Sequence, residues 1–173
     1  MAETKSQKLS AACSVGVVMG SDSDLPVMQR CLETLESFGI GYEVRIISAH
    51  RTPQIAHEYA TTAAARGLKV LIAAAGMSAA LGGVLAAGTT LPVIGVPMAS
   101  GPLAGVDAAL STMQMPPGVP VACMAIDQAG ATNAGIFAAQ ILAVADKAVA
   151  ARLVEFKKDQ ARKVVEKDQA LRR

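Results

Sequence analysis

The segment RIISAHRTPQ, residues 45–54, places a serine, a histidine and an arginine where a strand is expected to end and a helix to begin. Ile46 and Ile47 are typical of a strand interior, and Thr52 and Pro53 are typical of a helix cap and first helical position. In α/β proteins, ligands bind at the edge of the sheet where the strands end and the loops leading to the helices begin. The alternative is a polar surface loop without a ligand.

Three side chains of this segment suit a site for an anionic ligand. Arg51 can pair with a phosphate through its planar guanidinium, and the imidazole of His50 can carry a proton. Ser48 lies beside them and can donate a hydrogen bond. The chain's other histidine, His57, falls inside the following helix and is expected to be exposed.

A second candidate segment is MGSDSDLP, residues 19–26. Backbone N–H groups at a helix N-terminus, together with Ser21 and Ser23, can hold an anion, and Asp24 can bind ribose hydroxyls. Helix capping alone is the alternative explanation, because serine and aspartate are favoured caps. The segment has neither the GxGxxG nor the Walker pattern, so a dinucleotide or ATP is not indicated.

The third candidate is AAAGMSAALGG, residues 73–83. Gly76 allows close approach of the backbone to a ligand, and helix N–H groups after Ser78 can receive a carboxylate. A tight packing turn is the alternative. These three segments each follow a predicted strand, so a parallel sheet would bring them together at its carboxyl edge.

The elements that would position these segments alternate along the chain. Alternating strands and helices predict an α/β fold, in which helices cover both faces of a parallel sheet. A short Ala-rich helix is expected after Gly76. We expect strands at 14–20, 42–48, 69–75, 92–97 and 118–126, and helices at 24–39, 53–67 and 133–146.

Length and composition favour one domain that associates with copies of itself. The 173 residues are 52% hydrophobic and 17% charged, which is apolar for a monomer of this size. No charged residue occurs between Lys69 and Asp107, but glycines interrupt the window that could span a bilayer. We therefore expect a subunit interface and no membrane segment.

The two ends of the chain differ from its middle. Residues 1–13 are polar and predict a loose tail without a secretory signal, followed by a catalytic domain at 14–146. Residues 147–173 predict a helix with a modest apolar stripe, either solvated or packed in an oligomer. The net charge of +2 and the lack of Trp argue against nucleic-acid binding. Three widely spaced cysteines without a zinc pattern fit reduced thiols in the cytoplasm.

The chain resembles the PurE family of purine biosynthesis. VGVVMGSDSDLPVM, SAHRTP, LPVIGVP, STMQMPPGVPV and NAGIFAAQIL occur in the family's order and spacing, from about Ser14 to the C-terminal helix. This family comprises N5-carboxyaminoimidazole ribonucleotide mutases and aminoimidazole ribonucleotide carboxylases. The resemblance implies a three-layer, flavodoxin-like α/β sandwich assembled as a homo-octamer, acting on aminoimidazole ribonucleotide derivatives and CO2 without metal or cofactor.

The resemblance also implies roles for individual residues. His50 would be the general acid and base. Ribose and phosphate would be held by Ser21, Ser23 and Asp24, and the phosphate end also by Ser48 and Arg51. Apart from the resemblance, Gly76, Met77 and Ser78 of the third segment are expected to bind the substrate.

The third segment departs from the mutase pattern. Mutases usually have GAAHLPG where this chain has MSAALGG, so Ala80 replaces a second histidine and Gly82 a proline. The segment looks more like GRSNALSG of the carboxylases, which nevertheless usually have lysine at the position of Arg51. We expect a mutase, with direct carboxylation by CO2 as the first alternative and a non-catalytic nucleotide-binding module as the second.

Overall fold

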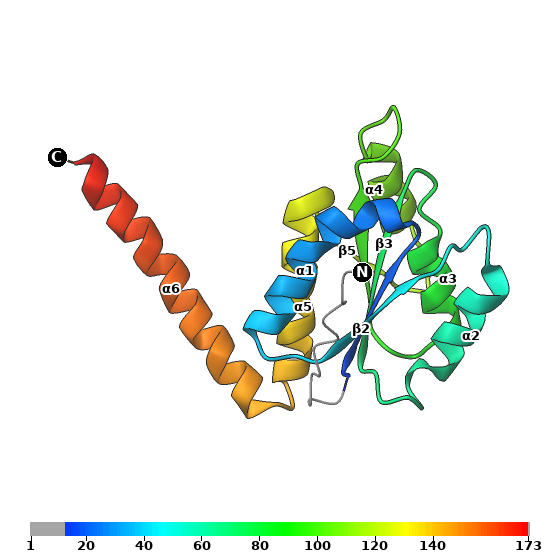
Figure 1. The fold of residues 1–173 in the computed structure, drawn as a ribbon, viewed down its shortest axis with the longest axis horizontal. Coiled ribbons are helices and arrows are strands. Elements are labelled where there is room, and N and C mark those ends of the chain that lie inside the picture. The colour runs from blue at the N-terminus through cyan, green and yellow to red at the C-terminus, as the bar shows by residue number, and fades with distance from the viewer. Residues whose placement is uncertain (1–12, 173) are drawn as a thin grey trace, which may run out of the picture.

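A computed structural model describes residues 13–172 and contains one parallel sheet (Figure 1). The strand order is β2-β1-β3-β4-β5, and every neighbouring pair is parallel. All carboxyl ends of the strands therefore meet at one edge of the sheet. The strands are β1 (Val15–Met19), β2 (Tyr42–Ile46), β3 (Val70–Gly76), β4 (Val93–Met98) and β5 (Ala122–Cys123).

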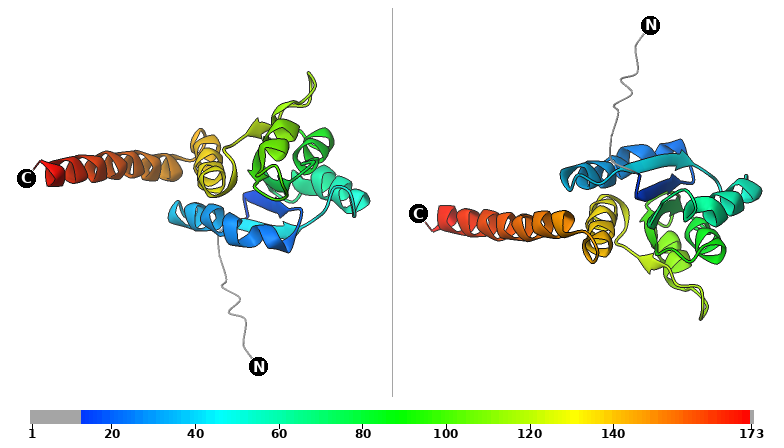
Figure 2. Two further views of the ribbon diagram at one scale, coloured as in Figure 1. Left: turned by 90° about the horizontal axis from the view of Figure 1, so that it is seen from above. Right: turned by 90° about the horizontal axis from the view of Figure 1, so that it is seen from below.

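Helices cover both faces of the sheet and make three layers (Figures 1 and 2). One face carries α1 (Leu25–Ser37), which follows the short 3-10 helix η1 (Asp22–Asp24), and α5 (Asp127–Ala143). The other face carries α2 (Pro53–Ala63), α3 (Leu81–Gly88) and α4 (Val106–Met113). The predicted three-layer α/β class is confirmed.

Strand alternation explains why both faces are apolar. Val17 and Ile72 point to the layer of α1 and α5, whereas Val18 and Leu71 point to the layer of α2 and α3. All four side chains are fully buried, as expected for central parallel strands covered on both sides. The result is a rigid sheet that fixes where each loop at its carboxyl edge begins.

Two predicted boundaries were wrong, and one helix was not predicted. The strand expected at 118–126 is only β5, because Pro120 lacks an N–H group and the chain pairs with β4 over two residues. Helix α4 was not expected, since its buried contacts come from the small residues Ala108 and Thr112. Helix α5 starts at Asp127 and not at 133, because its first turns bury Gly130 and Ala131.

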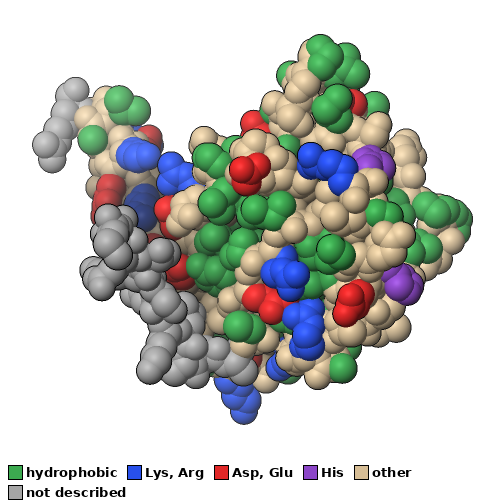
Figure 3. Space-filling model, turned by 45° about the vertical axis from the view of Figure 1, so that its right-hand side comes forward, with side chains coloured by type: hydrophobic (Ala, Val, Ile, Leu, Met, Phe, Trp, Pro, Cys, Tyr) green, Lys and Arg blue, Asp and Glu red, His purple; other side chains and the backbone are tan. Residues whose placement is uncertain are grey.

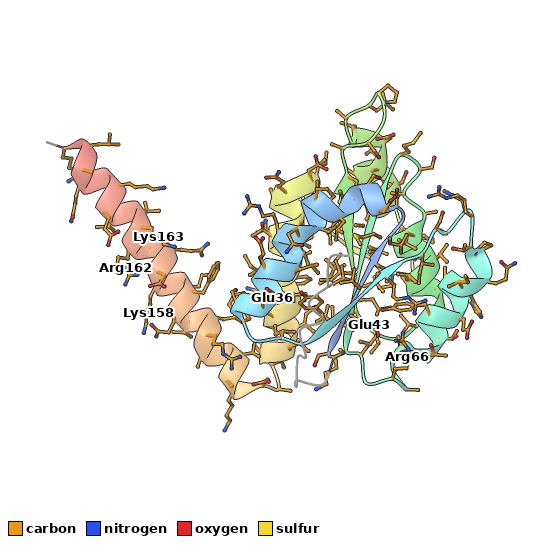
Figure 4. The ribbon with its side chains drawn as sticks, in the orientation of Figure 1. Glu36, Glu43, Arg66, Lys158, Arg162 and Lys163 are labelled. Atoms are coloured by element: carbon orange, nitrogen blue, oxygen red, sulfur yellow. The ribbon has the colours of Figure 1, made fainter. Side chains whose placement is uncertain are left out.

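The C-terminal helix α6 (Lys147–Leu171) leaves the domain after its first turns (Figures 1 and 2). Val149 is buried, the rings of Phe38 and Phe156 meet edge to face at 5.4 Å, and Arg152 Nη1 donates to Phe38 O at 2.5 Å. Figure 4 shows Lys158, Arg162 and Lys163 on the projecting part, and all described residues after 159 are exposed. The division of the chain at 146 stays a prediction, and residues 1–12 of the predicted tail lie outside the described range.

The edge strand β2 is held to α2 and to the turn that follows α2. Arg66 Nη1 donates to Glu43 Oε1 at 2.5 Å, and the two side chains point toward one another in Figure 4. The Arg66 guanidinium also lies over the Tyr59 ring, 4.6 Å from its centre. No helix within residues 13–172 is long and apolar enough to span a membrane.

Candidate active site

A pocket of about 690 Å³ lies at the carboxyl edge of the sheet. Its walls are the loops after β1, β2, β3 and β4, here called the first, second, third and fourth loops: residues 20–24, 47–52, 77–80 and 99–105. All nine site residues named from the sequence line it: Ser21, Ser23, Asp24, Ser48, His50, Arg51, Gly76, Met77 and Ser78. The chain thus brings the three predicted segments to one place, and the roles of these residues stay predictions.

The second loop is a closed network of hydrogen bonds. The Thr52 hydroxyl donates to Ser48 O at 2.9 Å and accepts from Ser48 N at 3.0 Å, while Thr52 N donates to Ser48 O at 2.8 Å. Thr52 also caps α2, with Pro53 at the first helical position, as predicted. This network fixes the turn that carries His50 and Arg51.

Arg51 connects the second loop to the first. Its Nε donates to Ser48 Oγ at 3.2 Å and its Nη2 donates to Gly20 O at 3.0 Å. Two of its five N–H donors are therefore engaged by residues that the structure describes, and the remaining three can bind an anion. The contacts hold the guanidinium in one orientation before a ligand arrives.

His50 is exposed at the mouth of the pocket, and no residue in the described range hydrogen-bonds to its imidazole. Both histidines of the chain reach the surface in Figure 3. His57 lies on α2 and outside the pocket lining, as expected. An imidazole free on both nitrogens can accept or donate a proton to a bound ligand.

The first loop combines capping with a polar wall. Ser21 caps η1, because its Oγ accepts from Ser23 N at 3.3 Å, and the Ser23 hydroxyl donates to Ser21 Oγ at 2.9 Å. Asp24 is buried, and burial raises the pKa of its carboxyl, although hydrogen bonds from Ser21 and Ser23 lower it. The nearby charges of Asp127 and Asp22 raise this pKa further.

The third loop has a different character. Met77 is exposed and has a positive φ of 55°, which is unfavourable for a side chain with a Cβ atom. Ala79 N donates to Met77 O at 2.9 Å, and Ala80 N donates to Ser78 O at 2.7 Å, so the loop is held by its own backbone. Helix α3 follows without a side-chain cap, which leaves its first N–H groups available to a ligand.

The fourth loop is the part of the wall that sequence reasoning missed. It follows β4 and brings Ser100 to the pocket beside Gly76. A signal was present, because the strand at 92–97 was predicted and the loop after any parallel strand lies at the same edge. Ser100 stands between an alanine and a glycine, without the acidic or cationic residues that marked the first and second loops.

Within residues 13–172 no group of three His, Cys, Asp or Glu side chains is placed to hold a metal ion. The polar groups of the pocket are hydroxyls, one buried carboxyl, an imidazole and a guanidinium. This set suits a phosphorylated sugar, because hydroxyls and carboxylates bind ribose and a guanidinium binds phosphate.

Comparisons with known proteins agree with this geometry. The family model described as AIR carboxylase matches residues 14–163. The N5-carboxyaminoimidazole ribonucleotide mutase of Thermotoga maritima is 52% identical over 157 residues, which cover 91% of both chains. The mutase of the same name from Bacillus subtilis is 49% identical over 157 residues, 91% of this chain and 97% of the relative.

A solved structure confirms the likeness of the fold. The crystal structure of Treponema denticola PurE superposes with a TM-score of 0.82 at 32% identity, covering 92% of this chain and 98% of that one. The match extends over almost all of both chains. This chain belongs to the AIR carboxylase (PurE) family.

Proposed function

We propose that this protein is an N5-carboxyaminoimidazole ribonucleotide mutase of purine biosynthesis. The observation that carries the proposal is one pocket that unites a free imidazole, an oriented guanidinium and a polar wall for a ribose. The relatives from Thermotoga maritima and Bacillus subtilis, which bear this name, align along almost their whole length. The reaction moves a carboxyl group from the exocyclic nitrogen of the ribonucleotide to a ring carbon.

The ribonucleotide would lie with its phosphate against Arg51 and Ser48. Arg51 has three N–H donors left for the phosphate. Its backbone N and its Nε both donate to Ser48 Oγ, and these bonds orient the Arg51 side chain. The ribose would rest on the first loop, where Ser21, Ser23 and Asp24 supply hydroxyls and a carboxyl. The imidazole end would then face Gly76, Met77 and Ser78 on the third loop.

His50 would transfer the protons that the reaction requires. The bond between the exocyclic nitrogen and the carboxyl group breaks, CO2 is retained in the pocket, and a carbon–carbon bond forms at the ring. The nitrogen gains a proton and the ring carbon loses one, so one group that accepts and donates a proton serves both steps. No electrons are exchanged with another molecule.

One observation favours a second reaction. Ala80 lines the pocket where a second histidine is usual in mutases, so the third loop resembles that of enzymes that add free CO2 to aminoimidazole ribonucleotide. An ultraviolet assay of the carboxylated imidazole distinguishes the two. We expect rapid conversion of the N-carboxylated ribonucleotide and slow reaction of aminoimidazole ribonucleotide with bicarbonate. The reverse result would assign direct carboxylation, and no reaction with either would indicate a binding module.

The protein would act as a homo-oligomer, with the family's octamer as the expected state. Exposed apolar side chains gather on the edge strand β2, at Val44 and Ile46, and on α4, at Val106, Leu110 and Met113. Covering such surfaces by other copies removes apolar area from water. Light scattering at micromolar concentration tests this, and a stable monomer would contradict it. The three free cysteines fit a reducing cytoplasm.

A further inference from the structure

Backbone strain concentrates at the carboxyl edge of the sheet. Within residues 13–172 three non-glycine residues have a positive φ: Met77 at 55°, Ala104 at 51° and Asp127 at 57°. They lie on the third loop, on the fourth loop and at the first residue of α5. Strained conformations persist only where surrounding contacts hold them, and they cluster at functional sites.

The third and fourth loops are packed into one another. A Cβ atom on Gly76 would overlap the Ser100 hydroxyl, so this hydroxyl lies directly against the Gly76 α-carbon. One residue further along, a Cβ atom on Gly101 would lie 3.4 Å from Met77 Cγ. The two loops therefore form a joint wall of the pocket, and displacing the fourth loop displaces the third.

Asp127, the first residue of α5, links the fourth loop to this helix. Its Oδ1 accepts a hydrogen bond from Ala99 N at 2.7 Å, at the point where the chain leaves β4. Asp127 makes this bond with a positive φ, a backbone conformation that glycine adopts at no steric cost. A carboxylate accepting from a backbone N–H makes a strong, charge-assisted bond.

We propose that Asp127 is a positioning residue, which holds the fourth loop against the third loop and so fixes the pocket wall that faces the imidazole end of the substrate. This inference rests on the proposed function for its kinetic consequence and on the contacts of Ala99, Ser100 and Gly76 for its structural part. Asp127 lies outside the pocket lining and acts through the loop.

Two substitutions separate the hydrogen bond from the backbone strain. Asp127→Gly keeps the positive φ and removes the acceptor, whereas Asp127→Asn keeps an acceptor oxygen on a residue that tolerates positive φ. Both remove the negative charge near Asp24, so a difference between them reports the loss of the side-chain acceptor and not the loss of charge. Asp146→Gly is the matched control, because Asp146 also accepts from backbone N–H groups at a helix start, at the opposite edge of the sheet.

Steady-state kinetics on the N-carboxylated ribonucleotide give the first readout. We expect Asp127→Gly to lower kcat about tenfold with KM within about twofold, since misplacing the wall disturbs the reacting end and not the phosphate contacts. Asp127→Asn should restore kcat to within about threefold of the unmodified protein, and Asp146→Gly should lower only the melting temperature. An Asp127→Gly protein with unchanged kcat, or an Asp127→Asn protein as slow as Asp127→Gly, overturns the proposal.

Hydrogen exchange over residues 98–106 gives a second readout that needs no turnover. We expect exchange about tenfold faster in Asp127→Gly than in the unmodified protein, and near the unmodified rate in Asp127→Asn. Equal exchange in all three proteins overturns the positioning role. If the unmodified protein is inactive while exchange depends on Asp127 as described, the proposed mutase function fails and the positioning role stands.

Discussion

The second and third loops both line the pocket and are built in opposite ways. In the second loop, Ser48, Arg51 and Thr52 bind one another and Gly20 through side-chain hydrogen bonds. In the third, Met77 is strained and exposed, and the bonds run between backbone groups. The second loop is fixed by side-chain hydrogen bonds, whereas the third is fixed by bonds within its backbone and by the packing of the fourth loop against it.

This difference matches the two tasks proposed for these loops. Binding a phosphate needs charged donors in one orientation, and a hydrogen-bonded network provides that before the ligand arrives. Enclosing a ring and a small uncharged molecule needs shape, which the close contact of Gly76 with Ser100 supplies. We therefore expect second-loop side chains to have large effects on binding and catalysis, and third-loop side chains to act through packing.

The largest expected effect is at His50. Asn at this position preserves polarity and size but cannot carry a proton, so kcat should fall by about a hundredfold to ten-thousandfold. Because the imidazole makes no hydrogen bond to any described residue, the melting temperature should stay the same. The ultraviolet assay and a thermal melt measure both quantities. Activity retained by His50→Asn would remove the proposed mechanism.

Arg51→Ala should have the next largest effect. It removes the proposed charge-assisted phosphate contact, which would be worth about 1.5–3 kcal/mol, so KM should rise about tenfold or more. It also breaks the bond to Gly20 O that joins the first two loops. Arg51→Lys keeps the charge without the planar fork and should recover only part of the affinity. A KM that does not change would assign Arg51 another role.

Gly76→Ala tests the claim that the third loop is defined by packing. The added Cβ overlaps the Ser100 hydroxyl, and kcat/KM should fall about tenfold as the two loops separate. Ser100→Gly removes the obstructing hydroxyl, so the double variant should recover part of the loss. Additive effects in this double-mutant cycle would show that the two loops are independent.

The same contrast explains how much could be predicted from sequence. The second loop was found because Ser48, His50 and Arg51 are residue types with recognisable chemistry at a strand-to-helix junction. The fourth loop was missed, because Ser100 acts by contact with Gly76 and such contacts depend on three-dimensional packing. Asp127 was missed for the same reason, since its partner Ala99 lies 28 positions away.

The accuracy of the predicted fold also depended on how strong the local sequence signal was. The central strands β1, β3 and β4 are continuous apolar runs, which identify buried parallel strands directly. Helix α4 and the short strand β5 carry no comparable signal. Both are stabilised by contacts with β4: Thr112 of α4 packs against Gly95, and β5 pairs with Ile94 and Gly95. Local sequence therefore identified the centre of the sheet better than its β5 edge.

A matched pair of serines gives the smallest and most discriminating test. Ser48→Ala removes the acceptor for Arg51 N and Nε, both at 3.2 Å, and should raise KM about fivefold by loosening the guanidinium. Ser78→Ala should raise KM only about twofold, because the third loop is expected to offer backbone N–H groups to the substrate. Both serines line the pocket, and each substitution removes one hydroxyl. The ratio of the two changes in KM therefore compares how much each loop depends on its side-chain hydroxyl. A larger effect at Ser78 than at Ser48 would reverse the comparison and make the third loop the one that binds through its side chains.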